Sequence, residues 1–131
     1  MTLRRSILIG LILLLTILNI NACSNSSDQA VKTVESYLTA LVSKNADKLA
    51  SLSCKSWEEQ ARLEIDSFQA VSAKLEGMSC KISGQDGDSS LVQCQGKIIA
   101  TYQNENQELS LANRTYRVKQ EQGDWRVCGY K

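Results

Sequence analysis

The sequence predicts an α+β fold: two or three N-terminal helices packed on one face of an antiparallel sheet, preceded by a signal peptide. Three observations predict it. A short apolar run follows two arginines at the start; apolar residues then recur at helical spacing; beyond Gly77 they alternate with polar residues as in strands. Helices that precede a strand meander cover one face of its sheet. A chain of 131 residues has room for one such domain.

Residues 1–22 have the layout of a signal peptide. Arg4 and Arg5 precede an apolar run from Ile7 to Leu18, which is about a dozen residues long, against the ~20 that a membrane-spanning helix needs. We therefore expect export and cleavage, with an uncleaved membrane anchor as the alternative.

The segment Ile20-Asn21-Ala22-Cys23 lies directly after the apolar run and resembles a bacterial lipobox. The resemblance implies cleavage after Ala22 and lipidation of Cys23, with residues 23–28 as lipidated cysteine and short polar tether and residues 29–131 as the domain. Ordinary cleavage that leaves a free Cys23 thiol is the alternative. Lipidation would anchor the protein to the cell membrane or the outer membrane, with its domain extracytoplasmic and close to the lipid headgroups.

Three helical segments are expected after the tether. Asp28 is a candidate cap for a helix with apolar residues at helical spacing from Val31 to Val42, and Asp47 for a short turn that follows. Ser56-Trp57-Glu58-Glu59 fits a capping box, so a third helix is expected from there through Leu75, with Gly77 as its stop.

Four strands are expected beyond Gly77, separated by turns rich in Gly, Asp and Asn. The third strand changes its apolar phase between Leu111 and Tyr116, which predicts a bulge near Asn113. The expected strands are Met78–Ser83, Leu91–Asn104, Gln107–Gln120 and Trp125–Tyr130.

Residues 28–130 resemble the nuclear transport factor 2-like superfamily, also called SnoaL-like. The resemblance rests on the opening helix with Glu35-Ser36-Tyr37-Leu38-Thr39-Ala40-Leu41, on the following Asn45-Ala46-Asp47-Lys48-Leu49, and on long strands that close with Asp124-Trp125-Arg126-Val127. It implies a curved sheet wrapped around a helix, with an apolar pocket inside the cone. A cystatin-like or other small α+β roll is the alternative fold.

Four cysteines remain after Cys23, and an even set in an exported chain predicts two disulfides. Four cysteines allow three pairings. Cys80 and Cys94 flank a turn centred on Gly87, so a hairpin would place them opposite one another. This favours Cys80–Cys94 and leaves Cys54 with Cys128. No Cys-x-x-Cys spacing is present, so we expect neither a zinc site nor a redox pair.

The composition argues against several kinds of function. The absence of histidine excludes histidine-based triads and histidine-ligated metals, and 15 basic against 14 acidic residues give a net charge of +1, which does not favour nucleic-acid binding. Glu64 and Asp66 are two apart on a helix and do not form a facing carboxylate pair. Five basic residues are expected on a solvated strand face: Lys97, Arg114, Arg117, Lys119 and Arg126.

No catalytic residue of the superfamily can be matched to this chain, so we expect no enzyme activity, metal or cofactor. Candidate pocket residues are the aromatic Trp57, Phe68, Tyr102 and Tyr116, with packing in the core or at the rim as the alternative. The hypothesis is a membrane-anchored, non-catalytic module that binds a small apolar ligand or an envelope protein. The alternatives are an accessory subunit of an envelope complex and a SnoaL-like isomerase or cyclase.

Overall fold

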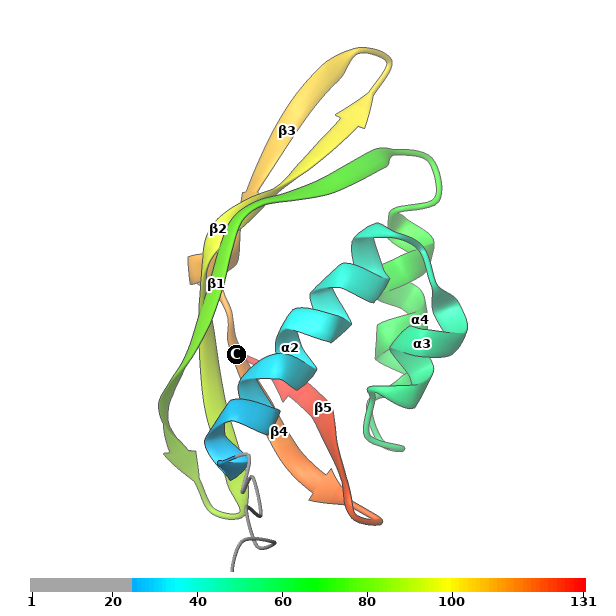
Figure 1. The fold of residues 1–131 in the computed structure, drawn as a ribbon. Coiled ribbons are helices and arrows are strands. Elements are labelled where there is room, and N and C mark those ends of the chain that lie inside the picture. Colours follow the sequence, from blue (N-terminus) through cyan, green and yellow to red (C-terminus); the bar gives the residue numbers. More distant parts are fainter. Residues whose placement is uncertain (1–24) are drawn as a thin grey trace, which may run out of the picture.

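The computed structural model describes residues 25–131, so the signal peptide, the lipobox and Cys23 lie outside the described residues. Three helices pack on one face of an open five-stranded antiparallel sheet, as Figure 1 shows, which confirms the predicted α+β class. The elements are α2 (Ser26–Val42), α3 (Ala46–Ser51), α4 (Glu58–Ser67), β1 (Ser72–Asp86), β2 (Ser89–Tyr102), β3 (Glu105–Ser110), the 3₁₀ turn η1 (Leu111–Asn113), β4 (Thr115–Glu121) and β5 (Asp124–Tyr130).

Helix α2 lies along the concave face of the sheet (Figure 1). Its buried stripe, which includes Val34, Tyr37, Leu38 and Leu41, follows the period of three and four residues that the sequence predicts. The helix begins at Ser26 and not at a cap on Asp28, because its backbone already turns there, with the Asp28 N–H donating to the Asn25 carbonyl at 2.8 Å. The predicted tether is therefore shorter than expected.

The two short helices begin and end at other residues than predicted. The side chain of Asn45, and not that of Asp47, caps α3 by accepting a hydrogen bond from the Lys48 backbone N–H at 3.0 Å. The predicted capping box at Ser56 is wrong, because the N-cap position of α4 is Trp57 and has no side-chain cap.

The C-terminal end predicted for the third helix is also wrong. Helix α4 ends at Ser67, and Leu75 lies in strand β1, opposite Ile98 of β2. The apolar spacing from Ile65 to Leu75 suits a helix locally, but pairing with β2 over the whole length of β1 decides the structure.

The sheet has the order β1-β2-β4-β5, and β3 pairs with a different part of the same edge of β2 that pairs with β4. Strand β2 pairs with β4 through residues 90–93 and with β3 through residues 97–102. The β2–β3 hairpin therefore extends beyond the helices (Figure 1). The predicted third strand is divided into β3 and β4 by η1, so the change of phase at Asn113 is a full break rather than a bulge, and it places Leu111 in the core.

Two glycines bend the long β1–β2 pair. Gly77 has a φ of +64° at a bulge in β1 and is not a helix stop, and Gly96 has a φ of +95° in β2. A Cβ on Gly96 would lie 2.5 Å from the Gly77 carbonyl oxygen, so only glycine allows this close approach of the two strands. The resulting bend makes the sheet concave toward the helices.

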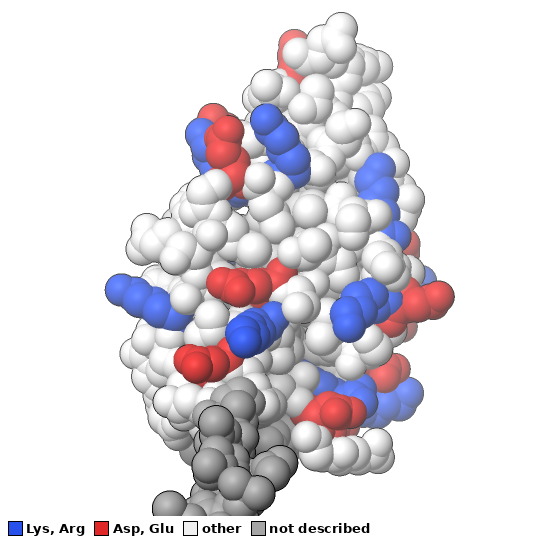
Figure 2. Space-filling model, viewed as in Figure 1, with Lys and Arg blue, Asp and Glu red and all other residues white. Residues whose placement is uncertain are grey.

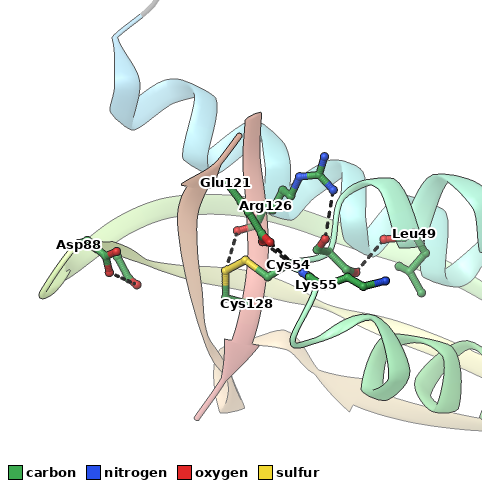
Figure 3. Close-up of a disulfide and its surroundings, with 9 residues drawn as sticks. Leu49, Cys54, Lys55, Asp88, Glu121, Arg126 and Cys128 are labelled. Atoms are coloured by element: carbon green, nitrogen blue, oxygen red, sulfur yellow. Dashed lines mark hydrogen bonds between the residues drawn. A yellow bond between two sulfur atoms is a disulfide. The ribbon is translucent and has the colours of Figure 1, made fainter. Parts of the chain in front are cut away.

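Both predicted cysteine pairs are joined by disulfides in the structure. Cys80 and Cys94 lie opposite one another in the β1–β2 pair, with Cα atoms 4.0 Å apart. Cys54, between α3 and α4, is bonded to Cys128 of β5 across a Cα distance of 4.9 Å (Figure 3). Two disulfides are typical of a protein that matures in an oxidising compartment outside the cytoplasm.

None of the helices within residues 25–131 is both long and apolar enough to cross a bilayer.

Candidate functional site

A cleft of about 340 Å³ opens between α4 and the segment that runs from the β2–β3 hairpin into β4. Glu64 and Phe68 face it because they are four residues apart on α4, and Arg114 and Tyr116 face it because they are two apart along the chain at β4. Phe68 and three aliphatic side chains form the apolar walls: Ile98, Leu109 and Leu111. The remaining lining residues are polar, so the cleft combines an apolar wall with polar groups at its rim and at one end.

The polar end is built around the Glu64 carboxylate, which is 8% exposed. Arg114 donates to its Oε1 at 2.5 Å, and the Tyr37 hydroxyl donates to its Oε2 at 2.8 Å. The Trp57 indole N–H in turn donates to the Tyr37 hydroxyl at 3.2 Å. A buried charge needs such partners, and here they come from α2, from the residue before α4 and from the start of β4.

Arg114 closes this end of the cleft with a side chain that is 40% exposed. Its guanidinium carbon lies 4.2 Å from the centre of the Tyr130 ring, a cation–π contact. Burial is the largest single influence on the pKa of Arg114 and lowers it, but the interactions with Glu64, Tyr116 and Tyr130 together raise it by more, so the net direction is upward. Arg114 therefore stays a cation at any physiological pH.

Two tyrosines beside Glu64 hold their protons tightly. Burial, followed by the charge of Glu64, raises the pKa of Tyr37 far above its usual range. Burial raises the pKa of Tyr116 to about 12, although the charge of Arg114 acts in the opposite direction. The Tyr116 hydroxyl has no hydrogen-bond partner of normal geometry among the described residues, so it is a buried polar atom without an acceptor at the edge of the cleft.

A larger groove of about 490 Å³ lies between α3 and α4. Its charged side chains pair with one another or with neighbours: Lys55 with Glu58 at 3.0 Å and Arg62 with Glu59 at 2.7 Å. Such exposed pairs are ordinary for a helix surface. We place the candidate site in the smaller cleft because it holds two buried polar side chains, Glu64 and Tyr116, and the Tyr116 hydroxyl has no acceptor in the described part of the chain.

The structure brings two of the four predicted pocket residues to the cleft, Phe68 and Tyr116. Trp57 lies behind it, with its ring edge-on to Tyr130 at 5.4 Å. The placement of Tyr102 in the pocket is wrong. Tyr102 lies on the same face of β2 as the buried Ile98 and Ala100. The strand continues past the helices at this point, however, so the Tyr102 side chain is half exposed and lies outside the cleft.

Two site residues, Glu64 and Arg114, were not predicted. Glu64 lies on the buried face of α4, in line with Ala61, Ile65 and Phe68. A glutamate at helical spacing among apolar residues is the sequence feature that indicates a buried carboxylate here. Arg114 was expected on a solvated strand face, but its partner is fifty positions away in sequence.

Glu121 lies beside the Cys54–Cys128 disulfide (Figure 3). Its carboxylate accepts the Lys55 backbone N–H at 3.1 Å, and the two sulfurs are bonded to each other. We therefore assign no metal site to this cluster.

No family model and no curated protein matches the chain. A SEC-C motif containing protein from Rhodopseudomonas palustris is similar in structure, with 11% identity, 79% of each chain covered and a TM-score of 0.51. A candidate scytalone dehydratase from Novosphingobium aromaticivorans follows, with 14% identity, 76% of each chain covered and a TM-score of 0.47. At these identities the first likeness shows the fold alone, and the second is too weak to carry an argument. The expected arrangement, helices on the concave face of a curved antiparallel sheet, is present, and membership of the nuclear transport factor 2-like superfamily stays a prediction.

Proposed function

We propose that the protein is an extracytoplasmic lipoprotein, anchored through Cys23, whose domain binds a small and mainly apolar ligand in the cleft between α4 and β4 without transforming it. The observation that carries this proposal is the cleft itself: four apolar side chains form part of its lining, and the buried carboxylate at its polar end already has its ion-pair partner. Its volume of about 340 Å³ is within the range of small-molecule pockets.

The polar end favours a ligand with one neutral hydrogen-bonding group. Glu64 and Arg114 offset each other, and the second carboxylate of the lining, Glu108, pairs with Lys97, so the site offers little net charge to an ionic ligand. Tyr116 offers a hydroxyl whose proton has no acceptor among the described residues, and the guanidinium of Arg114, which is 40% exposed, has N–H groups to share. A carbonyl or ether oxygen on an otherwise apolar molecule would accept from these donors.

The binding test is a titration of the purified full chain with the neutral apolar dye N-phenylnaphthylamine. Leu109→Asp places a charge on the wall of the cleft, at a side chain that is 46% exposed, and should weaken dye binding at least tenfold. Leu63→Asp is the matched control, because Leu63 is 51% exposed on α4 and does not line the cleft. Equal binding by both variants would contradict the proposal.

The anchoring test is the intact mass of the chain extracted from membranes. We expect acyl chains on the parent protein and none on Cys23→Ser, which should appear in the soluble fraction. An unmodified parent chain would contradict the anchor while leaving the cleft proposal to its own test.

One observation favours a second function, an isomerase or cyclase: a carboxylate is buried at the end of the cleft. A general base must be able to take a proton from its substrate. In this structure both Glu64 oxygens already accept hydrogen bonds, from Arg114 and from Tyr37, which favours a structural role. Incubation of the retained small molecule with the protein in D₂O separates the two functions, since a carbon-bound proton would exchange only in the enzyme.

A further inference from the structure

A second hollow, the α2–β5 groove, has a cationic lining and a volume of about 470 Å³. Lys32, Lys48 and Arg126 line it against a single carboxylate, that of Asp124. The cleft and the α3–α4 groove both carry more carboxylates than cations. Among the described residues, the ammonium groups of Lys32 and Lys48 have no ion-pair partner, so the positive charge of the α2–β5 groove is not offset.

Two buried N–H groups of the groove residues also lack acceptors. They are the indole Nε1 of Trp125 and the Nε of Arg126, neither of which has a hydrogen-bond partner in the described part of the chain. The Arg126 side chain is 21% exposed and has only long contacts, with Asp124 at 3.5 Å and with the Ser53 carbonyl at 3.4 Å. A buried donor without an acceptor is destabilising, so an acceptor bound here would stabilise the protein.

We propose that the α2–β5 groove binds a phosphate group, and that this phosphate belongs to a phospholipid headgroup of the membrane to which the protein is anchored. A phosphate oxygen accepts several hydrogen bonds at once, and guanidinium and ammonium groups are its usual partners. Arg126 and Trp125 would bind the phosphate oxygens from the wall of the groove, and Lys32 and Lys48 from its rim.

The position of the groove points to a lipid as the source, and this step depends on the proposed lipidation of Cys23. Helix α2 begins at Ser26, so an extended chain from Cys23 to it spans at most about 11 Å. The groove begins one turn into this helix, at Gln29, and reaches Asp124 at the β4–β5 turn. The start of α2 and this turn lie at the same end of the molecule (Figure 1). That end would face the headgroups.

The charges on the molecule are otherwise mixed. Figure 2 shows lysine, arginine, aspartate and glutamate interspersed over the visible face. A general electrostatic attraction to an anionic surface is therefore not expected from a chain with 15 basic and 14 acidic residues. Headgroup binding would have to come from a defined site such as the groove.

The test uses the two tryptophan indole N–H signals in an NMR spectrum of the ¹⁵N-labelled full chain, held in a phosphate-free maltoside detergent and titrated with inorganic phosphate. We expect a saturable shift of the Trp125 signal and none of the Trp57 signal, because the Trp57 N–H is bonded to Tyr37. An unmoved Trp125 signal would overturn the proposal.

A matched pair of double variants separates the groove from overall charge. Lys32→Gln with Lys48→Gln should weaken phosphate binding about tenfold, because both rim cations are lost. Lys74→Gln with Lys131→Gln removes the same charge from exposed positions outside the groove and should leave binding unchanged. Equal weakening by the two pairs would contradict a defined site.

The source of the phosphate is tested in nanodiscs without added phosphate. The Trp125 signal should be shifted in phosphatidylglycerol discs and not in discs of phosphate-free galactolipid, and the Lys32/Lys48 variant should abolish the difference. A shift with inorganic phosphate but none in phospholipid discs would overturn the lipid as the source. The intact mass of each sample reports acylation independently, so a failed anchor is distinguished from a failed groove.

Discussion

Removal of the Arg114 side chain is the sharpest perturbation of the cleft. Arg114→Leu keeps much of the volume but leaves Oε1 of Glu64 without its donor, at a carboxylate that is nearly buried. It also removes the cation from the face of the Tyr130 ring. Glu64 would then keep one hydrogen bond, from Tyr37.

The expected cost follows from the burial of the pair. Breaking a fully buried ion pair costs about 3–5 kcal/mol, whereas exposed pairs are worth less than about 1 kcal/mol. Glu64 is nearly buried but Arg114 is more than a third exposed, so solvent screens part of the effect. We expect a loss of about 2–3 kcal/mol in the free energy of unfolding, or about 10 °C in the melting temperature of a domain of this size.

The assay is urea unfolding followed by circular dichroism at neutral pH. Arg62→Leu is the matched control, because it removes an arginine that pairs with Glu59 and Asp66 on the exposed face of α4, and it should cost less than about 1 kcal/mol. Adding Glu64→Gln to Arg114→Leu should recover part of the loss, since the stranded charge is gone. Equal costs for the two arginine variants would refute the interpretation of the site.

Three further predictions concern the fold. Burial raises the pKa of Tyr116 from 10.0 to about 12, so the folded state holds this proton more tightly than the unfolded state does. The resulting stabilisation of the folded state, about 2–3 kcal/mol, is complete below pH 10 and is lost as the pH rises toward 12. In the Tyr116→Phe variant, the decrease in the free energy of unfolding between pH 10 and pH 12, measured by urea titration, should be smaller by that amount. Gly96→Ala should lower the free energy of unfolding by at least about 3 kcal/mol, because the new Cβ would clash with the backbone of Gly77. Gly87→Ala is the control and should cost about 1 kcal/mol, because no atom lies within 4 Å of its Cβ. Thermal melts measure both. Replacing Cys54 and Cys128 by serine opens a link between residues 74 apart and should cost roughly 4 kcal/mol in urea unfolding; an unchanged midpoint would contradict a stabilising role for this disulfide.

Local patterns predicted the parts of the fold that depend on local forces. The stripe on α2 could be predicted because burial of one helix face repeats every three to four residues. The Cys80–Cys94 pair could be predicted because a hairpin places residues equidistant from its turn opposite each other. The same local reasoning failed at Leu75, where pairing with Ile98 of a distant segment outweighs helical spacing.

The candidate site could be predicted only in part, since its central contact joins distant residues. Phe68 and Tyr116 are aromatic and could be proposed as pocket residues from their type alone. Sequence alone does not predict a buried Glu64, because charged side chains are seldom buried without partners, and its partner Arg114 is brought to it only by the break at η1. Tyr102 has the strand phase of a core residue, but its place beyond the helices depends on where those helices end.

Native mass spectrometry of the full chain extracted from its membrane shows in one spectrum whether an anchored, disulfide-linked chain carries a small apolar molecule. We expect acyl chains, two disulfides and a retained small molecule, which is lost in Leu109→Asp and kept in Leu63→Asp. An acylated, oxidised chain that retains no molecule and takes up no N-phenylnaphthylamine would refute ligand binding in the cleft.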